Sequence, residues 1–351
     1  MSNLHPTVNS IDDATAAAIE PGAKVLVTGG TGFLGTYIIG ELVRSGYAVR
    51  AIHRQGAIPF SLPASIGEQV EWLHCDVRDP LGLEDAMAGM DAVIHAAAKI
   101  SFSAQERREL WSTNIEGTAN VVNAALERNI RRFLYVSSVA ALGRTASSEE
   151  VTEEKSWEKS PYNTNYAISK FHGEMEVWRG MGEGLPAVIV NPSTILGYGD
   201  WNNTSCAIFR SVYNEFPWYT EGINGFVDVQ DTARAIVRLL QTDIHGERYI
   251  LNGDNWSWRH LFETMAKEFG KKPPTREATP LLAGIAWRAE KVKSLFTGRR
   301  TLLTRESARV AASSTCFSSG KFLRLLPDFR FTPLEETIRT ACQHYLRTAQ
   351  A

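Results

Sequence analysis

A glycine-rich turn near the N-terminus constrains the fold of this chain more than any other feature. Residues 24–35 read KVLVTGGTGFLG, in which a β-rich run, Lys24–Thr28, leads directly into the glycines. The segment that follows, Tyr37–Ser45, carries apolar residues at helical spacing. A strand, a tight turn and a helix start are therefore predicted in succession. An ordinary glycine turn is the alternative interpretation.

The three glycines of the turn have separate predicted roles in bringing the backbone close to a diphosphate. Gly29 permits the turn, Gly32 leaves no side chain where a pyrophosphate approaches, and Gly35 lets helix and strand pack closely. The helix N-terminus then offers free N–H groups and the positive end of its dipole to the anion. The residues of this turn that we expect to contact a dinucleotide are Gly29, Thr31, Gly32, Phe33, Leu34 and Gly35.

Composition restricts the classes of partner. The 351 residues are 44% hydrophobic and 22% charged, the usual balance of a soluble globular protein with a buried core. The formal charge of −2 provides no field that would attract nucleic acid or anionic lipid, so we expect neither as a partner. No apolar run has the length needed to span a bilayer, and the N-terminus lacks the order of a signal peptide. Residues 1–20 are predicted to be a polar tail with a short helix over Ile11–Glu20.

Cysteine and histidine usage favours a cytoplasmic protein without a metal. The four cysteines are far apart and form no CxxC pair, so neither a disulfide framework nor a thiolate zinc site is suggested. The eight histidines form no HExxH motif or comparable cluster. We therefore predict no metal site.

Alternating strands and helices predict a doubly wound parallel sheet of the Rossmann type, which is an α/β fold. The expected strands of the first half are Lys24–Thr28, Ala48–His53, Val70–His74, Ala92–His95 and Phe133–Val136. Between and after them, helices are expected at Leu81–Ala88, Trp111–Arg128 and Pro161–Arg179. In such sheets the ligand lies beyond the carboxyl ends of the strands.

The end of the second strand points to the choice of nicotinamide cofactor. A carboxylate there accepts hydrogen bonds from the ribose 2′-hydroxyl, whereas a cationic side chain pairs with a 2′-phosphate. The segment Ala51–Gln55 holds no acid, and the strand ends in His53 and Arg54. NADP is therefore favoured over NAD, with Arg54 as the phosphate ligand and His53 as a helper. The alternative is that Arg54 is merely a solvated loop residue.

Three more strand ends carry candidate ligand contacts. Asp76, with Val77 after it, could receive the adenine amino group or could instead cap the next helix. Three small residues, Ala96 to Ala98, allow a ligand close to the backbone or pack against a helix. Asn114 interrupts a helical pattern in which it is a poor helix former, which suggests a polar role.

The predicted chemistry is centred on Tyr166 and Lys170, which share one face of a helix because they are four residues apart. A free phenol has a pKa of about 10, too high for easy proton exchange at neutral pH, and a nearby cation favours the phenolate. The pair follows a strand that ends in Ser137 and Ser138 and precedes an Asn-Pro-Ser turn at 191–193.

Seven motifs in order now show a resemblance: TGGTGFLG, DVRD, HAAA, NIEGT, YVSS, YAISK and NPSTILGYG. From about residue 22 to about residue 255 the chain resembles the extended short-chain dehydrogenases/reductases, which include nucleotide-sugar epimerases, dihydroflavonol reductases and 3β-hydroxysteroid dehydrogenases. The resemblance implies Tyr166 as general acid/base, Lys170 lowering its pKa and holding the nicotinamide ribose, and Ser138 orienting the substrate oxygen. It also implies cofactor contacts from Asp76, Val77, Ala97, Asn114, Ser137, Pro192 and Ser193.

The second half is predicted to carry most of the substrate site. By resemblance, residues 21–195 form the cofactor domain. Residues 225–255 are expected to return to its sheet through strands at Gly225–Val229 and Glu247–Leu251. A smaller, mostly helical substrate lobe is expected to be formed by residues 196–224 and 256–351. An aromatic-rich stretch in this lobe suggests either a wall for a bulky apolar or ring-bearing substrate or ordinary core packing. Its members are Trp201, Phe209, Tyr213, Phe216, Trp218 and Tyr219.

A basic amphipathic pattern over residues 281–300 has three interpretations, a lid, a dimer contact or a surface that lies on a membrane. Membrane contact is the least favoured of these, and a homodimer is compatible with the sequence. A closing helix is expected at Pro333–Tyr345.

The sequence as a whole predicts an NADP(H)-dependent oxidoreductase that interconverts a carbonyl and a hydroxyl on a hydrophobic or cyclic small molecule. One alternative is a nucleotide-sugar epimerase or dehydratase with tightly bound NAD. Against it, Val190 to Ser193 replaces the Arg-Tyr-Phe-Asn type of run seen in those enzymes. The other alternative is a non-catalytic NADP sensor, although such proteins generally lose the active-site Tyr or Lys.

Overall fold

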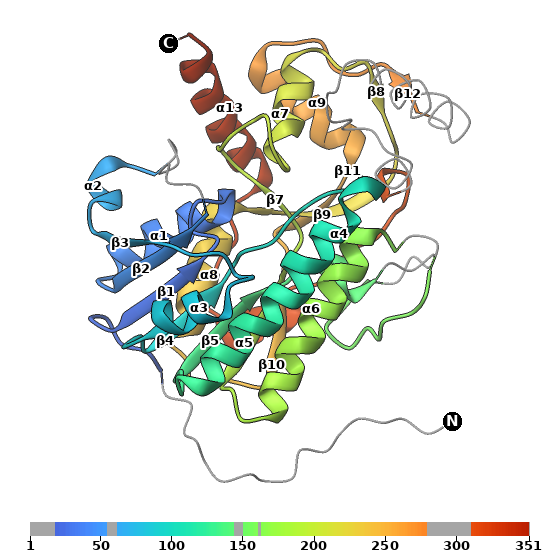
Figure 1. Cartoon of the computed structure of the whole chain (residues 1–351). Coiled ribbons are helices and arrows are strands. Elements are labelled where there is room, and N and C mark those ends of the chain that lie inside the picture. Colours follow the sequence, from blue (N-terminus) through green and yellow to red (C-terminus); the bar gives the residue numbers. More distant parts are fainter. Residues whose placement is uncertain (1–17, 55–61, 144–149, 161–162, 279–309, 351) are drawn as a thin grey trace.

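A seven-stranded sheet forms the centre of the molecule, and its strand order is β10-β6-β5-β4-β1-β2-β3. The computed structural model describes residues 18–54, 62–143, 150–160, 163–278 and 310–350. All neighbouring strands of this sheet run parallel, which confirms the predicted doubly wound fold (Figure 1). Its strands are β1 (Lys24–Thr28), β2 (Ala48–His53), β3 (Val70–His74), β4 (Ala92–His95), β5 (Arg132–Val136), β6 (Ala187–Pro192) and β10 (Glu247–Leu251).

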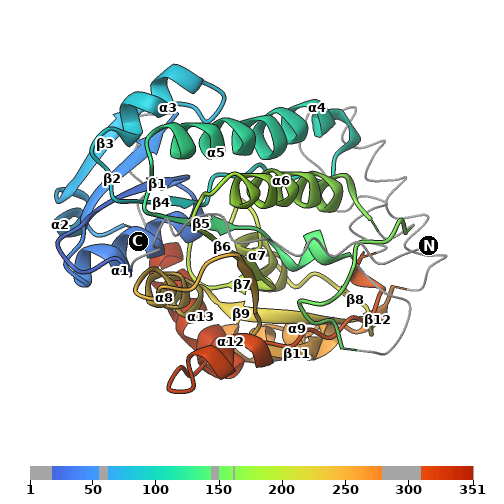
Figure 2. The same ribbon diagram turned by 90° about the horizontal axis from the view of Figure 1, so that it is seen from below.

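Helices cover both faces of the sheet, as Figure 2 shows from below. Strands β4, β5 and β6 are buried along their whole length because neither face meets water. One face carries α1 (Phe33–Arg44), α8 (Val229–Leu240) and α12 (Gly320–Leu325). The other face carries α3 (Pro80–Met87), α5 (Gly117–Glu127) and α6 (Asn165–Gly182).

The helix predicted at Trp111–Arg128 is interrupted by a π-helical turn. Helix α4 (Arg107–Trp111) passes into the wide turn Ser112–Glu116, which continues as α5. The turn brings the carbonyl of Asn114 against Gly173 of α6, where a Cβ would collide with that carbonyl. The sequence prediction missed the interruption because a π turn leaves little trace in an apolar pattern.

Shorter elements complete the cofactor-side half. They are α2 (Ala64–Gly67) and two 3-10 turns, Ala104–Glu106 and Val139–Leu142.

A smaller lobe lies above the sheet in Figure 1. Phe33, at the start of α1, packs on the lobe beside Gly197 and Gly199, which places the lobe at the carboxyl ends of the sheet strands. Its strands are β7 (Thr194–Leu196), β9 (Ile223–Asp228) and β11 (Asp254–Ser257), with a second pair, β8 (Trp218–Tyr219) and β12 (Arg276–Glu277). Its helices are α7 (Cys206–Tyr213), α9 (Trp258–Phe269) and α13 (Leu334–Gln350).

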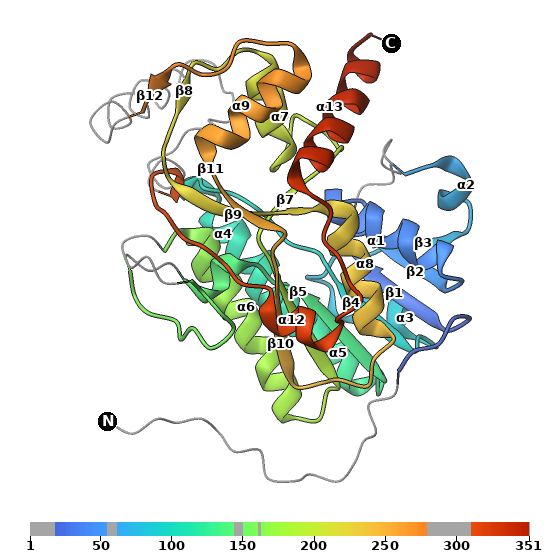
Figure 3. The same cartoon turned by 180° about the vertical axis from the view of Figure 1, so that it is seen from behind.

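The expected assignment of segments to the two halves needs two corrections. Strand β10 and helix α8 return to the large sheet as predicted, but β9 pairs with β7 and β11 in the lobe. Conversely, α12 lies in the C-terminal part of the chain yet packs beside β10, where Phe322 joins the core under α8 (Figure 3). The pairing of β9 depends on its distant partners, which the sequence pattern of the strand does not reveal.

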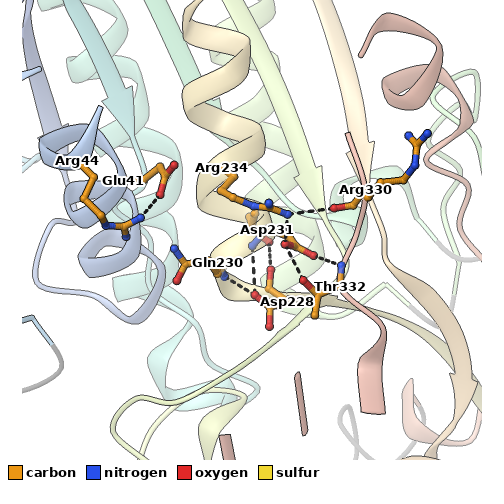
Figure 4. Close-up of polar contacts among 9 residues, drawn as sticks. Glu41, Arg44, Asp228, Gln230, Asp231, Arg234, Arg330 and Thr332 are labelled. Carbon is orange, nitrogen blue, oxygen red and sulfur yellow. Dashed lines mark hydrogen bonds and ion pairs between the residues drawn. The ribbon is translucent and has the colours of Figure 1, made fainter. Parts of the chain in front are cut away.

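The N-terminus of α8 joins the sheet half to the C-terminal segment (Figure 4). Asp228 caps the helix by accepting the N–H groups of Gln230 and Asp231. The buried Asp231 carboxylate pairs with Arg234 and accepts both the N–H and the hydroxyl of Thr332. The segment that leads into α13 is therefore held on α8 by a buried acid.

In the described part of the chain, no helix is both long enough and apolar enough to cross a membrane. The helix predicted within 281–300 and most of the predicted N-terminal tail lie outside the described residues.

Candidate active site

The glycine turn after β1 has the close contacts that the sequence predicts. Gly29 adopts a positive φ of 72°, and a Cβ there would lie 2.6 Å from the N atom of Ala97. A Cβ at Gly35 would collide with the carbonyl oxygen of Gly29. Gly32 is exposed and precedes α1 without a capping side chain, and Leu34 packs inward on the core. The turn is therefore tightly packed on the protein side and exposed at Gly32, where α1 begins beside the half-buried Thr31.

The ends of β2 and β3 bring together two arginines around an acid. His53 lies beside His74 in the strand register, so Arg54 adjoins the segment that carries Asp76. Arg78 donates two hydrogen bonds to the Asp76 carboxylate, of 3.0 and 2.7 Å. Those bonds, with a smaller contribution from Arg54, hold the pKa of Asp76 below its ordinary value. The Arg54 side chain is exposed at the end of β2.

The cofactor contacts predicted for Asp76 and Val77 stay predictions, and only the capping alternative for Asp76 is excluded. Asp79, and not Asp76, caps α3 through the N–H of Gly82 at 3.2 Å. Val77 is buried against Gly117, where a Cβ would lie 2.7 Å from a Val77 methyl group. The His53 ring nitrogen Nδ1 is buried and has no hydrogen-bond partner among the described residues.

A buried chain of hydrogen bonds supports the end of β4. The N–H of Ala97 donates to the Thr28 hydroxyl at 3.2 Å, which contacts His95 Nδ1 at 2.6 Å. The other ring nitrogen of His95 contacts the Thr118 hydroxyl at 3.0 Å. Burial lowers the pKa of His95 to about 3, so the ring is neutral and rigidly held. Of the three predicted small residues, Ala96 and Ala97 are half-buried and Ala98 is exposed.

The Asn114 side chain is engaged by protein groups. Its Oδ1 accepts the N–H of Lys99 at 2.7 Å, and its Nδ2 donates to the Lys99 carbonyl and the Ser169 hydroxyl, both at 2.9 Å. The polar role expected of Asn114 is therefore to tie the loop after β4 to α6. Its predicted contact with a cofactor stays a prediction.

Ser138 and Tyr166 meet at the end of β5. The Ser138 oxygen accepts the N–H of Ala140 at 3.2 Å, and its hydroxyl lies near enough to the Tyr166 phenol to lower the pKa of that phenol. Helix α6 begins at the Thr164 cap, which accepts the N–H of Ala167 at 3.0 Å and so positions Tyr166 in the first turn. Burial raises the pKa of Tyr166 to about 12, although the hydrogen bond with Ser138 partly offsets it.

Lys170 lies one turn further along α6 and is only 1% exposed. Its ammonium donates to the Tyr135 hydroxyl at 2.9 Å and to the carbonyl of Val136 at 2.8 Å. Burial lowers the pKa of Lys170 to about 7, and the Glu174 carboxylate partly offsets this effect. The resemblance implied a Tyr166 pKa lowered by lysine. The structure differs, because burial disfavours the charged form of both groups.

The remaining predicted contacts lie at the ends of β5 and β6. The Ser137 hydroxyl donates to Glu174 at 2.6 Å and so faces the protein interior. Pro192 is buried at the end of β6, and the neighbouring Ser193 hydroxyl is buried with no hydrogen-bond partner among the described residues. Asn191 Oδ1 of the same turn also lacks a partner among the described residues, so both residues retain an unused polar atom.

The aromatic stretch of the lobe is divided between two roles. Trp201 stacks on Tyr345 with ring centroids 5.2 Å apart, and Phe209 and Tyr213 pack with Phe269, so core packing explains these three. The others lie nearer the surface. They are Phe216, Trp218 and Tyr219.

Two residues of the site were missed from the sequence. The edge of Phe102, in the loop after β4, approaches the Tyr166 ring with centroids 6.2 Å apart. Glu174, four residues after Lys170 on α6, accepts hydrogen bonds behind the site. The repeated spacing of four from Tyr166 to Lys170 to Glu174 is the signal that could have identified the acid.

Comparison with known proteins agrees with this geometry. The model of the NAD dependent epimerase/dehydratase family matches residues 25–251. A Synechocystis protein named "Putative dihydroflavonol 4-reductase" is 29% identical over 86% of this chain and 88% of its own. The sterol demethylase protein B of Methylococcus capsulatus is 29% identical over 79% and 84%. The crystal structure of gox2253 superposes with a TM-score of 0.77 at 28% identity, covering 94% of this chain and 99% of that one. The chain therefore belongs to the NAD dependent epimerase/dehydratase family, within the extended short-chain dehydrogenases/reductases, and is an NAD(P)-dependent oxidoreductase.

Proposed function

We propose that this protein is an NADP(H)-dependent reductase that converts a carbonyl of a hydrophobic or cyclic small molecule into a hydroxyl. The observation that carries the proposal is that the Tyr166 phenol lies within electrostatic reach of the Ser138 hydroxyl, one helical turn before the buried Lys170.

The protonation state of Tyr166 suits the proton donation that a reduction needs. With a pKa of about 12 the phenol holds its proton at neutral pH, so it can donate that proton to an oxygen that gains negative charge. The Ser138 oxygen already accepts the N–H of Ala140, which leaves the hydroxyl proton able to point at the same substrate oxygen. Oxidation would need the phenolate, which burial disfavours.

The residues present fit a dinucleotide. Gly29 and Gly35 leave no room for a Cβ, so the turn packs tightly on the neighbouring backbone, and the helix N-terminus beside it suits a diphosphate. The unpaired hydroxyl of Ser193 suits a carboxamide, and the resemblance assigns Lys170 to the nicotinamide ribose. A bound nicotinamide supplies the hydride.

NADP preference is the finer part of the proposal, and it is supported by Arg54. This guanidinium is exposed at the end of β2, where no acid competes for the ribose. Its neighbour Arg78 is engaged by Asp76, so Arg54 is the arginine more available to a 2′-phosphate.

Replacing Arg54 by alanine is therefore expected to weaken NADPH binding by about 10- to 100-fold, the contribution of a charge-assisted hydrogen bond. NADH binding should change little, because NADH has no 2′-phosphate. Titration of intrinsic protein fluorescence with each cofactor measures both affinities. Arg44→Ala is the matched control, since Arg44 pairs with Glu41 at the far end of α1. Equal losses for the two cofactors would contradict the assignment.

The substrate class follows from the apolar approach to Tyr166. Phe102 packs on the Tyr166 ring, and Ile100 of the same loop is 47% exposed. The names of the relatives, a dihydroflavonol reductase and a sterol demethylase protein, support a polycyclic or aromatic substrate.

A substrate panel tests the proposed function. Purified protein is incubated with NADPH or NADH and a set of cyclic ketones, aryl ketones and aldehydes, and cofactor absorbance is followed. We expect consumption of NADPH with a subset of the cyclic or aryl ketones. Cofactor retained through purification, without net turnover of added NADPH, would instead support an epimerase or dehydratase.

A further inference from the structure

A buried carboxylate behind the site collects four donors. Glu174 is 2% exposed. Its Oε2 accepts the Ser137 hydroxyl at 2.6 Å and the Asn191 amide at 2.8 Å. Its Oε1 accepts Arg248 Nη1 at 3.0 Å and Trp178 Nε1 at 3.4 Å. A buried acid with this many partners has its desolvation offset, and removing it would leave those donors unpaired.

Three of the four partners belong to neighbouring strands or directly follow one, and Trp178 lies on α6 itself, so the acid joins these strands to one another. Asn191, at the end of β6, uses the same amide nitrogen to donate to the carbonyl of Ser138 at 3.0 Å. Arg248 of β10 also donates to the carbonyl of Glu153 and so anchors the segment of residues 150–160. A shift of Glu174 would therefore move the backbone that carries the Ser138 hydroxyl.

Glu174 is also the acid that acts on Lys170. The other titratable groups that surround the Lys170 ammonium are Tyr135, Tyr166 and His95, which are neutral at pH 7 because burial raises the pKa of both phenols and lowers that of the imidazole. The Glu174 charge favours the protonated form of Lys170 against the cost of burial. Arg248 pairs with the same carboxylate at 3.0 Å and competes for its charge.

We infer that Glu174 is a positioning residue: its buried carboxylate stabilises the Lys170 ammonium from one turn further along α6, and it holds the Ser138 backbone through Asn191. Its consequence for turnover rests on the proposed function, whereas its effect on Lys170 does not.

The first test follows the charge of Lys170 without any turnover. Protein labelled with ¹³C at the lysine Cε and the glutamate Cδ is titrated by NMR. The Lys170 resonance is assigned by its loss in Lys170→Arg, and the Glu174 resonance by its loss in Glu174→Gln. In the wild type we expect the Glu174 signal to inflect at the pH where Lys170 titrates. Independent titration of the two signals in the wild type overturns the inference even if no variant folds.

The second test compares matched variants of the same helix. Glu174→Gln is expected to lower the Lys170 midpoint by about one pH unit. Glu174→Asp, which keeps the charge but shortens the side chain, should leave that midpoint near the wild-type value. The control is Glu176→Gln, whose acid is paired with Arg179 on the surface and should have no effect. An unchanged midpoint in Glu174→Gln, or an equal shift in the control, refutes the role.

Turnover then separates the two proposals. If the protein reduces a panel ketone, Glu174→Gln should move the alkaline limb of the kcat profile to lower pH, in parallel with the NMR midpoint. Glu174→Asp should lower kcat without moving that limb. A Glu174→Gln variant that loses activity equally at every pH would show a merely structural residue. Absence of wild-type reduction contradicts the proposed function and leaves the NMR result standing.

Discussion

Replacing Tyr166 by phenylalanine is expected to lower kcat about a thousandfold, the contribution typical of a positioned general acid. The substitution removes one hydroxyl and keeps the ring, so the packing of Phe102 on Tyr166 is retained. No other phenol among the described residues is shown in contact with Ser138, and Lys170 is directed at Tyr135 and Val136. The proton therefore has no substitute donor of comparable position.

Cofactor binding should survive this change. NADPH affinity is expected to stay within about threefold of the wild-type value. The residues predicted to bind the diphosphate and the 2′-phosphate follow β1 and β2, whereas Tyr166 lies on α6. Steady-state reduction of the best panel ketone measures kcat, and fluorescence titration measures NADPH affinity. Tyr213→Phe, which removes a hydroxyl in the lobe core, is the control and should retain activity. Undiminished kcat in Tyr166→Phe would remove the basis of the proposed function.

The sheet could be predicted because its signals are local. An apolar run such as Ala92–His95, or a glycine turn such as Gly29 to Gly35, can be recognised from a few consecutive residues. The π turn at Ser112–Glu116 and the place of β9 in the lobe sheet could not be predicted. The turn is set by the approach of α6 at Gly173, and the pairing of β9 is set by β7 and β11. Both depend on segments distant in the sequence.

The candidate site likewise combines features that the sequence predicts with features that it does not. The spacing of Tyr166 and Lys170 identifies a helix face, and the structure places Tyr166 beside Ser138 and buries Lys170 behind it. The protonation of the pair could not be inferred, because it depends on burial, and burial is a property of the packed molecule. A lysine beside a tyrosine suggested a lowered phenol pKa, whereas the buried phenol has a pKa of about 12. The role of Glu174 was not predicted because its partners, Ser137 and Asn191, come from other parts of the sequence.

Replacing Gly35 by alanine is expected to have the largest effect on stability and to abolish cofactor binding. The added Cβ would meet the carbonyl oxygen and carbon of Gly29 and the Cα of Gly30, which are backbone atoms that no side-chain rotation can move. Overpacking of this kind costs about 1 to 3 kcal/mol or more, beyond the gain of up to about 1 kcal/mol that alanine brings to a helix. To relieve the collision the turn must open. The backbone predicted to bind the diphosphate would then be displaced.

Gly40→Ala in the same helix supplies the matched comparison. A Cβ there would meet the flexible end of Arg44 at 3.3 Å and a methyl of Ile66 at 3.9 Å, and no backbone atom outside the helix lies among its near neighbours. This variant should be as stable as the wild type or more stable by up to about 1 kcal/mol, because alanine favours helix. Urea unfolding followed by circular dichroism measures the free energy of unfolding of both variants. NADPH titration measures their cofactor affinity. Since the two substitutions are chemically identical, a selective loss in Gly35→Ala has to come from the approach of α1 to the turn after β1. Tight NADPH binding by Gly35→Ala would show that the dinucleotide does not lie on this turn.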